Sequence, residues 1–211
     1  MKIGILGSGS VGQTLGKGLA ARGHAVCIGT RSPEALTTWC TDVGALGSAA
    51  PFAICVAWAE LVVLSVRGGA VEAVLRSVEP RHFANKVVID TSDPLDFSSG
   101  RPSLFVGTTD SLGERVQRWL PNARVVKALN TVLAAVMIEP SLSGGEPDMF
   151  IAGNDHAAKR QVTELLEAFG WPVIDLGDIE NARWLEALSL LWVVYSHRTG
   201  KQHHAFKLVG K

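Results

Sequence analysis

Residues 3–12 read Ile-Gly-Ile-Leu-Gly-Ser-Gly-Ser-Val-Gly, a short apolar run followed directly by the pattern G-x-G-x-x-G. The apolar run predicts a buried strand, and apolar residues at helical spacing predict a helix over 11–21. Residues 25–28 then supply a second strand at the distance that a βαβ unit needs. A strand, a glycine turn and a helix in this order are typical of a dinucleotide-binding pocket.

Each glycine of the pattern has its own expected role. Gly7 permits the tight turn, Gly9 lets the backbone approach a pyrophosphate, and Gly12 lets the helix pack close to the sheet. The unpaired N–H groups at the start of the helix then face the phosphates. A plain structural turn is the alternative. The residues expected to bind the cofactor here are Gly7, Ser8, Gly9, Ser10, Val11 and Gly12.

The end of the second strand indicates which dinucleotide binds. NAD sites usually carry Asp or Glu at this point, whereas this chain has Thr30, Arg31 and Ser32. The Arg31 guanidinium suits a 2′-phosphate, and the two hydroxyls can donate to the same oxygens, so we expect NADP. Alternatively, Ser32 caps a helix that begins at Pro33 and Arg31 lies in solvent. The two interpretations are compatible.

Length and composition limit the class of protein. The 211 residues are 47% hydrophobic, enough for one core, so we expect a single Rossmann-like domain over 1–211 with 182–211 as C-terminal helix and tail. The formal net charge is zero, which argues against a nucleic-acid or membrane-surface partner and favours a small molecule.

The cysteines and the apolar stretches bear on location. Cys27, Cys40 and Cys55 are odd in number and form no C-x-x-C pair, which indicates reduced thiols and no thiolate metal site. Polar and glycine positions interrupt any secretory signal at the N-terminus, and 185–195 is too short to cross a bilayer. We therefore expect a cytoplasmic protein without a metal.

The rest of the chain alternates between strand and helix, which predicts an α/β fold with a doubly wound, mostly parallel sheet. A βαβ extension follows, and then a helix over 182–195 that is apolar nearly all round and needs cover from the sheet or a second subunit. The expected strands are 61–66, 87–90, 124–129, 149–153 and 172–174, and the expected helices are 71–78, 112–119 and 155–169.

Ligands of such sheets lie beyond the carboxyl ends of the strands. We expect one crevice lined by the five turns 7–12, 30–32, 65–67, 90–93 and 127–131. In the third turn, Ser65, Val66 and Arg67 are expected to contact the cofactor, although Arg67 could equally be a solvated residue at a helix start.

The last two turns carry polar side chains with open alternatives. Asp90 and Asp93 are either an acid pair or, the favoured interpretation, helix caps and turn formers. Asn130 and Thr131 can hold a carboxamide or a substrate carbonyl near the nicotinamide, and Lys127 is expected to point into solvent. No catalytic residue is assigned, because hydride transfer needs two rings held at reacting distance rather than a nucleophile or a metal.

Several stretches of the chain follow a pattern that is known from other proteins. They are 1–12, 23–24, 29–31, 88–95 (Val-Ile-Asp-Thr-Ser-Asp-Pro-Leu) and 126–131 (Val-Lys-Ala-Leu-Asn-Thr). Together they resemble the NADP oxidoreductases dependent on the deazaflavin coenzyme F-420. They are also similar to the cytosolic nicotinamide domain of the six-transmembrane metalloreductases.

The resemblance implies a homodimer in which NADPH lies across the strand ends and passes a hydride to a deazaflavin or flavin-like acceptor. The family's phosphate-binding arginine falls on Arg31 and its hydroxyl neighbour on Thr30. Two positions depart from relatives: Ala35 stands where some carry a basic residue, and Arg67 where many have proline.

Two other functions stay open. One is NADP(H)-dependent reduction of a small carbonyl or imine, and the other is NADP(H) sensing without turnover. The stretch 197–207 gathers cations without one acid, so it either meets an anionic acceptor tail or is a solvated terminus. His203 and His204 are adjacent and would point apart, so we assign no metal to them.

Overall fold

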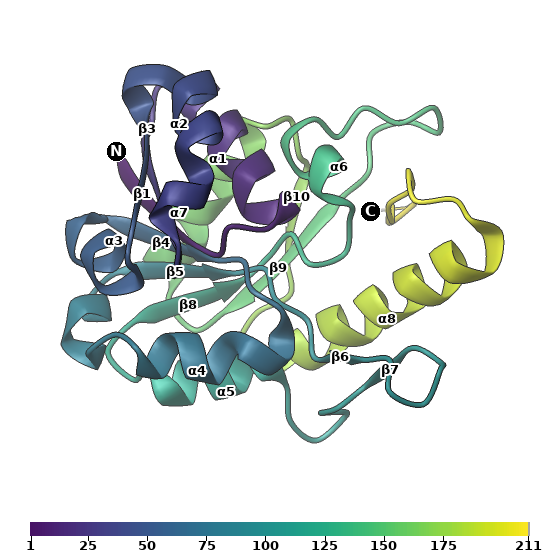
Figure 1. Cartoon of the computed structure of the whole chain (residues 1–211). Helices are drawn as coiled ribbons and strands as arrows, with labels where there is room; N and C mark the ends of the chain where they lie inside the picture. Colours follow the sequence, from purple (N-terminus) through teal and green to yellow (C-terminus); the bar gives the residue numbers. More distant parts are fainter. Residues whose placement is uncertain (211) are drawn as a thin grey trace.

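The computed structural model describes residues 1–210, which fold around one eight-stranded sheet (Figure 1). Its strand order is β10–β9–β8–β5–β4–β1–β2–β3. The strands are β1 (Lys2–Leu6), β2 (Ala25–Gly29), β3 (Gly47–Ala50), β4 (Leu61–Leu64), β5 (Val87–Asp90), β8 (Arg124–Lys127), β9 (Met149–Gly153) and β10 (Val173–Asp175). All neighbours are parallel except β8 and β9. The doubly wound, mostly parallel sheet is confirmed, and its βαβ extension joins through one antiparallel pair.

Helices cover both faces of this sheet, because successive strand residues point to opposite faces. Ile3 and Ile5 belong to one core and Leu6 to the other. The first core is closed by α1 (Ser10–Ala21), α2 (Thr37–Val43), α6 (Ala134–Ile138) and α7 (His156–Glu167). The second is closed by α3 (Phe52–Trp58), α4 (Val71–Arg76) and α5 (Leu112–Trp119). Short 3-10 helices span Pro33–Leu36, Gly44–Leu46, Gly68–Ala70, Pro80–Phe83 and Ile179–Asn181.

Most expected elements are present, with ends that differ by a few residues. Strand β4 ends at Leu64 because Ser65 already turns toward the glycine motif, where it packs on Gly7. The edge strand β3 was not expected, since its sequence Gly-Ser-Ala-Ala has neither alternation nor a large apolar residue. It forms because β2 offers it a complete parallel ladder.

The C-terminal helix α8 (Ala182–Thr199) begins against the body of the protein and then projects away from it (Figure 1). Beside it lies a hairpin of β6 (Leu95–Asp96) and β7 (Ser103–Leu104). The inner side of α8 is buried, but Trp184 and Leu191 on its outer side are 57% and 56% exposed. The sequence predicts cover on more than one side, and the outer side of α8 is left without it within residues 1–210. No helix in this range has the length and apolar character needed to span a bilayer.

The tail that follows α8 folds back onto it. The His204 ring stacks on Trp192 with centroids 4.7 Å apart, and the Trp192 indole donates to the His204 carbonyl oxygen at 2.9 Å. Further along, the Leu208 amide donates to Asp148 at 2.7 Å. Part of the stretch that the sequence suggested was solvated is therefore packed, although His203 and Lys207 remain exposed.

Candidate dinucleotide and acceptor site

The glycine turn has the geometry that its sequence predicts. Gly7 has φ +128°, a conformation that favours glycine, and its amide donates to the Gly29 carbonyl at 3.0 Å. A Cβ on Gly12 would collide with the Gly7 carbonyl oxygen, whereas a Cβ on Gly9 would meet nothing within 4 Å. Gly7 and Gly12 thus close the turn against the sheet, and Gly9 leaves open space above the start of α1.

The start of α1 is itself unoccupied by protein groups. Its cap residue Gly9 has no side chain to bond the first amides, and the first turn contains no acidic residue. The first N–H groups of a helix have no partner within the helix and carry its positive dipole end. This twelve-residue helix therefore presents donors to the open space over Gly9, an arrangement typical of phosphate-binding sites.

A hollow of about 460 Å³ lies on the β2 side of this turn. Thr30 is buried in its wall, donates to the Ser8 hydroxyl at 3.2 Å and accepts from the Ser32 amide at 3.3 Å. Arg31 is exposed at the rim, and its guanidinium forms no ion pair within residues 1–210. Ser32 precedes the 3-10 helix Pro33–Leu36, but its side chain makes no capping bond.

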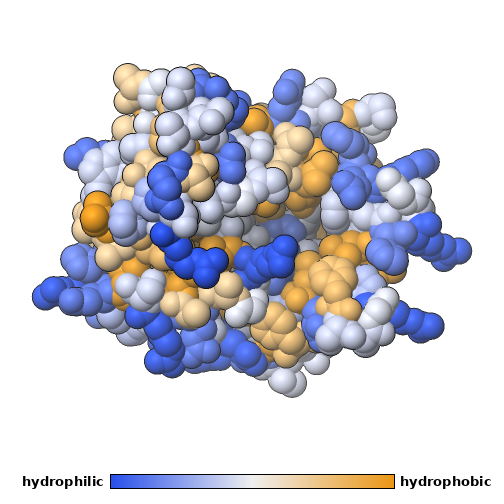
Figure 2. Space-filling model, in the orientation of Figure 1, coloured by the Kyte–Doolittle hydropathy of each residue, from blue (hydrophilic) through white to orange (hydrophobic). Residues whose placement is uncertain are grey.

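A second hollow, of about 970 Å³, lies on the other side of the turn. It shares Val66 and Ala70 with the first hollow, so the two form one crevice across the glycine turn. Figure 2 shows the recess, with hydrophilic surface at its centre and hydrophobic surface toward α8. Its lining is Gly9, Ser10, Val11, Ser65, Val66, Arg67, Gly68, Gly69, Ala70, Thr91, Ser92, Asp93, Leu95 and Phe97.

Four of the five expected turns line this crevice, and the fifth, 127–131, does not. Lys127 was expected in solvent, but its side chain is 0% exposed. Its ammonium lies 3.0 Å from Asp90 and 2.9 Å from Glu186, and it also donates to the Ser92 carbonyl. A buried ammonium needs such partners, because leaving water is costly for a charge. Burial alone would lower the pKa of Lys127, but the neighbouring carboxylates outweigh it and raise that pKa.

Asp90 and Asp93 have separate roles and do not form an acid pair. Asp90 accepts from the Ser92 amide at 3.0 Å and from its hydroxyl at 2.6 Å, as a turn former does. Asp93 lines the larger hollow, where Asn130 donates to it at 2.9 Å and Ser189 at 2.7 Å. Burial raises the pKa of Asp93 to about 7, although nearby Lys127 opposes the rise.

Asn130 and Thr131 are buried behind the crevice rather than among its lining residues. The Asn130 amide donates to Asp93 and, at 3.0 Å, to the Leu185 carbonyl. Its own oxygen, Oδ1, has no hydrogen-bond partner within residues 1–210. Asn130 thus positions Asp93 and keeps one acceptor unused.

Glu186 and Ser189 on α8 support the residues of the site. The sequence pattern did not predict either of them as a site residue. Glu186 accepts from the Leu112 and Gly113 amides at 3.0 and 2.9 Å in addition to binding Lys127. Ser189 holds Asp93. The available signal was that these two polar residues interrupt an otherwise apolar helix, which indicates buried polar partners.

The fold, the glycine turn and the crevice at the strand ends define a Rossmann-type dinucleotide-binding domain. The chain belongs to the family of NADP oxidoreductases, coenzyme F420-dependent, whose model matches residues 2–94. A crystal structure from Arthrobacter sp. FB24, named a "putative f420 dependent nadp-reductase", is 42% identical, with 99% of both chains covered and a TM-score of 0.94. The protein is accordingly an NADP-dependent oxidoreductase.

Two further proteins are similar to the chain, one in sequence and one in fold. The rat metalloreductase STEAP3 is 28% identical over 199 residues, which cover 90% of this chain but 36% of STEAP3, so the chain spans about a third of that relative. A reductive aminase from Aspergillus terreus, solved with NADPH, is 19% identical. The match spans 94% of this chain and 62% of the aminase chain. Its TM-score of 0.68 shows a common fold.

Proposed function

We propose that the protein transfers a hydride between NADP(H) and a deazaflavin or flavin-like acceptor. One observation carries this proposal: a crevice across the glycine turn has an unpaired arginine at its smaller end and about 970 Å³ of space at its larger end. The smaller end suits the phosphorylated adenosine half of a dinucleotide. The larger end has room for a nicotinamide and a second planar ring.

The chain's own residues divide the work of holding NADPH. The amides at the start of α1, with Ser8, Gly9 and Ser10, face the pyrophosphate, and Arg31 with the hydroxyls of Thr30 and Ser32 faces the 2′-phosphate. When bound, NADPH supplies the hydride.

The unused Asn130 Oδ1 is an acceptor suited to the carboxamide N–H₂ of the nicotinamide. In this proposal, Asn130 and Thr131 contact the nicotinamide from behind the lining of the larger hollow. Apolar Val66, Leu95 and Phe97 line the larger hollow and limit the access of water to the two rings.

We also propose that two copies of the chain pair through the outer side of α8. Trp184 and Leu191 are more than half exposed there, and Val194 and Tyr195 continue the same apolar surface. Large apolar side chains gathered on one helix mark an interaction surface. A second copy provides the missing cover for this helix.

Location and organisation remain part of the proposal. Cys27, Cys40 and Cys55 are free thiols in the structure, a cysteine usage typical of a reducing compartment, so we propose a cytoplasmic protein. The two cores share one sheet, which supports a single domain with α8 and its tail as an appendage.

The test is a binding titration followed by an acceptor panel. Purified protein should bind NADPH more tightly than NADH in a calorimeter. It should then consume NADPH with the deazaflavin or with a free flavin. Turnover only with a small cyclic imine or carbonyl would replace the proposed acceptor class. Equal affinity for NADP⁺ and NADPH without turnover of any acceptor, ferric chelates included, would indicate a sensor.

A further inference from the structure

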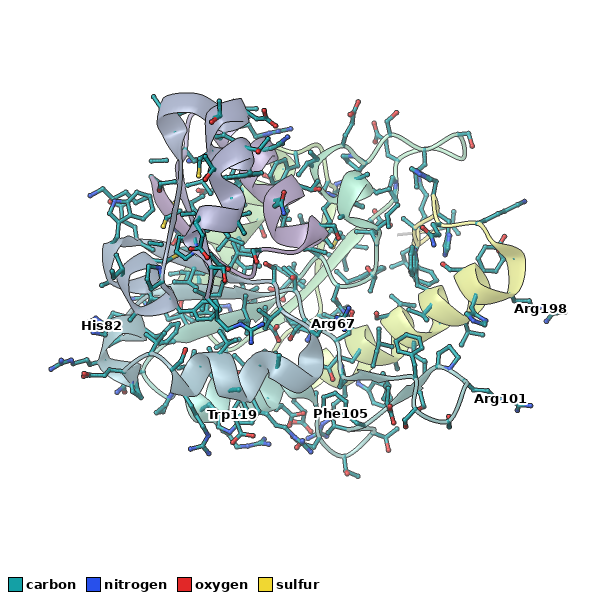
Figure 3. The ribbon with its side chains drawn as sticks, in the orientation of Figure 1. Arg67, His82, Arg101, Phe105, Trp119 and Arg198 are labelled. Atoms are coloured by element: carbon teal, nitrogen blue, oxygen red, sulfur yellow. The ribbon has the colours of Figure 1, made fainter. Side chains whose placement is uncertain are left out.

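Arg67 is an unpaired cation in the larger hollow. It follows β4 through Ser65 and Val66, and its guanidinium forms no ion pair or hydrogen bond within residues 1–210. Figure 3 shows it at the centre of the molecule's open face, between the strand ends and α8.

The backbone that carries Arg67 is held tightly in place. A Cβ on Gly68 would collide with the carbonyl of Asp93, so the two loops touch backbone to backbone. The Ala70 amide also donates to the Arg67 carbonyl at 2.8 Å. Because the loop is fixed against the Asp93–Pro94 turn, the arginine side chain must extend from a fixed point at the wall of the hollow.

The charge of Arg67 is not balanced by the rest of the lining. Asp93 is the other ionisable residue of the hollow, and its oxygens already accept from Asn130 and Ser189. Burial favours the neutral form of this carboxyl, whose other charged neighbours are Lys127 and Glu186. The larger hollow therefore has excess positive charge on walls that are otherwise mostly apolar, glycine or hydroxyl-bearing.

The position of Arg67 separates it from the groups that suit the cofactor. Arg31 lies in the smaller hollow, and the start of α1 lies where the two hollows meet. Both anionic groups of NADPH thus have donors without Arg67. Arg67 shares its hollow with Leu95 and Phe97, the apolar residues beside which a planar acceptor would lie.

We propose that Arg67 binds an anionic group, a phosphate or carboxylate, of the hydride acceptor. A guanidinium can donate two parallel hydrogen bonds to either group, which fixes both charge and orientation. The inference rests on the proposed function and narrows it: the acceptor is an anionic planar molecule rather than a neutral one.

The pair FMN and riboflavin tests this directly, because the two differ by one phosphate. In wild-type protein saturated with NADP⁺, flavin fluorescence quenching should show tighter binding of FMN than of riboflavin. Arg67→Ala should weaken FMN binding and lower kcat/KM for FMN by roughly 10- to 100-fold, the range for a hydrogen bond to a charged group. Binding and kcat/KM for riboflavin should change less than about threefold in Arg67→Ala. Arg67→Lys should recover part of the loss with FMN.

Arg101→Ala is the matched control, because Arg101 is also exposed but lies in the loop of the β6–β7 hairpin and points away from the crevice (Figure 3). It should leave both flavins unchanged. The NADPH titration separates the two sources of phosphate: a loss of NADPH affinity in Arg67→Ala assigns Arg67 to the cofactor and overturns the proposal. Wild-type protein that does not prefer FMN, or that binds neither flavin, overturns it as well. Preferential FMN binding without turnover would instead support the anion site while the proposed hydride transfer fails.

Discussion

The Ser189 hydroxyl on α8 donates to the Asp93 carboxylate at the wall of the larger hollow, at 2.7 Å across 96 positions of sequence. This bond ties α8 to the crevice, and the ion pair between Glu186 and Lys127 ties the same helix to the end of β8. The helix that presents an apolar outer surface is therefore the same helix that holds a crevice carboxyl in place.

Asp93 gives the protein a stability that falls as pH rises. Its folded pKa of about 7 lies above the reference value of 3.8, so the folded state binds this proton more tightly than the unfolded state does. Its contribution is complete below pH 4 and is lost by about pH 7. The free energy of unfolding of Asp93→Asn minus that of wild type should rise over this range, by up to about 1.4 kcal/mol per pH unit.

Urea unfolding at several pH values measures this difference. Asp96→Asn is a control of opposite sign, because hydrogen bonds from the Ser98 amide and hydroxyl lower the pKa of Asp96. That lowered pKa favours folding at higher pH, so the difference for Asp96→Asn should fall as pH rises. A pH-independent difference for Asp93→Asn would contradict the assignment.

Arg31 should determine the preference for NADP. Arg31→Ala removes a charged donor from the smaller hollow, so we expect NADPH binding to weaken by roughly 1.5 to 3 kcal/mol and NADH binding to stay nearly unchanged. Calorimetric titration with both nucleotides measures this. Arg160→Ala, an exposed arginine on α7 away from the crevice, should change neither. Equal losses for NADPH and NADH in Arg31→Ala would refute a 2′-phosphate role.

The two glycines of the turn should respond differently to alanine. The Cβ of Gly12→Ala would collide with the Gly7 carbonyl. This substitution should therefore lower the free energy of unfolding by roughly 1 to 3 kcal/mol or more. The added Cβ of Gly9→Ala meets no protein atom within 4 Å. The free energy of unfolding of this variant should therefore lie within about 1 kcal/mol of the wild-type value. Its methyl group would nevertheless occupy the pyrophosphate space and abolish NADPH binding. Wild-type affinity in Gly9→Ala would show that no phosphate lies there.

The outer side of α8 should control assembly. A charge at Trp184→Asp or Leu191→Asp would be buried without a partner in a dimer, so either variant should be monomeric by light scattering. Ile54→Asp changes an equally exposed apolar residue, 60% exposed on α3, and should leave the mass unchanged. Wild-type protein that is monomeric at all working concentrations would rule out this interface.

The sequence could predict the parts of the fold that depend on local spacing. The glycine turn, the strand β5 at 87–90 and β9 at 149–153 appear where the pattern predicted them, because strand burial and glycine conformation are local properties. The edge strand β3 was missed, since its small residues carry no such pattern and only the open edge of β2 defines it.

The sequence by itself determined the dinucleotide-binding half of the protein: a G-x-G-x-x-G turn behind a buried strand, followed by Thr30 and Arg31. Only the tertiary structure decided how the residues after β5 and β8 are arranged around the larger hollow. Lys127 reads as a surface lysine until Asp90 and Glu186, far apart in the chain, neutralise it in the interior. Asn130 was expected in the crevice but lies behind it, where its amide donates a hydrogen bond to Asp93. The physical reason is that a buried charge is stable only beside a partner of opposite charge, and folding decides which distant residue becomes that partner.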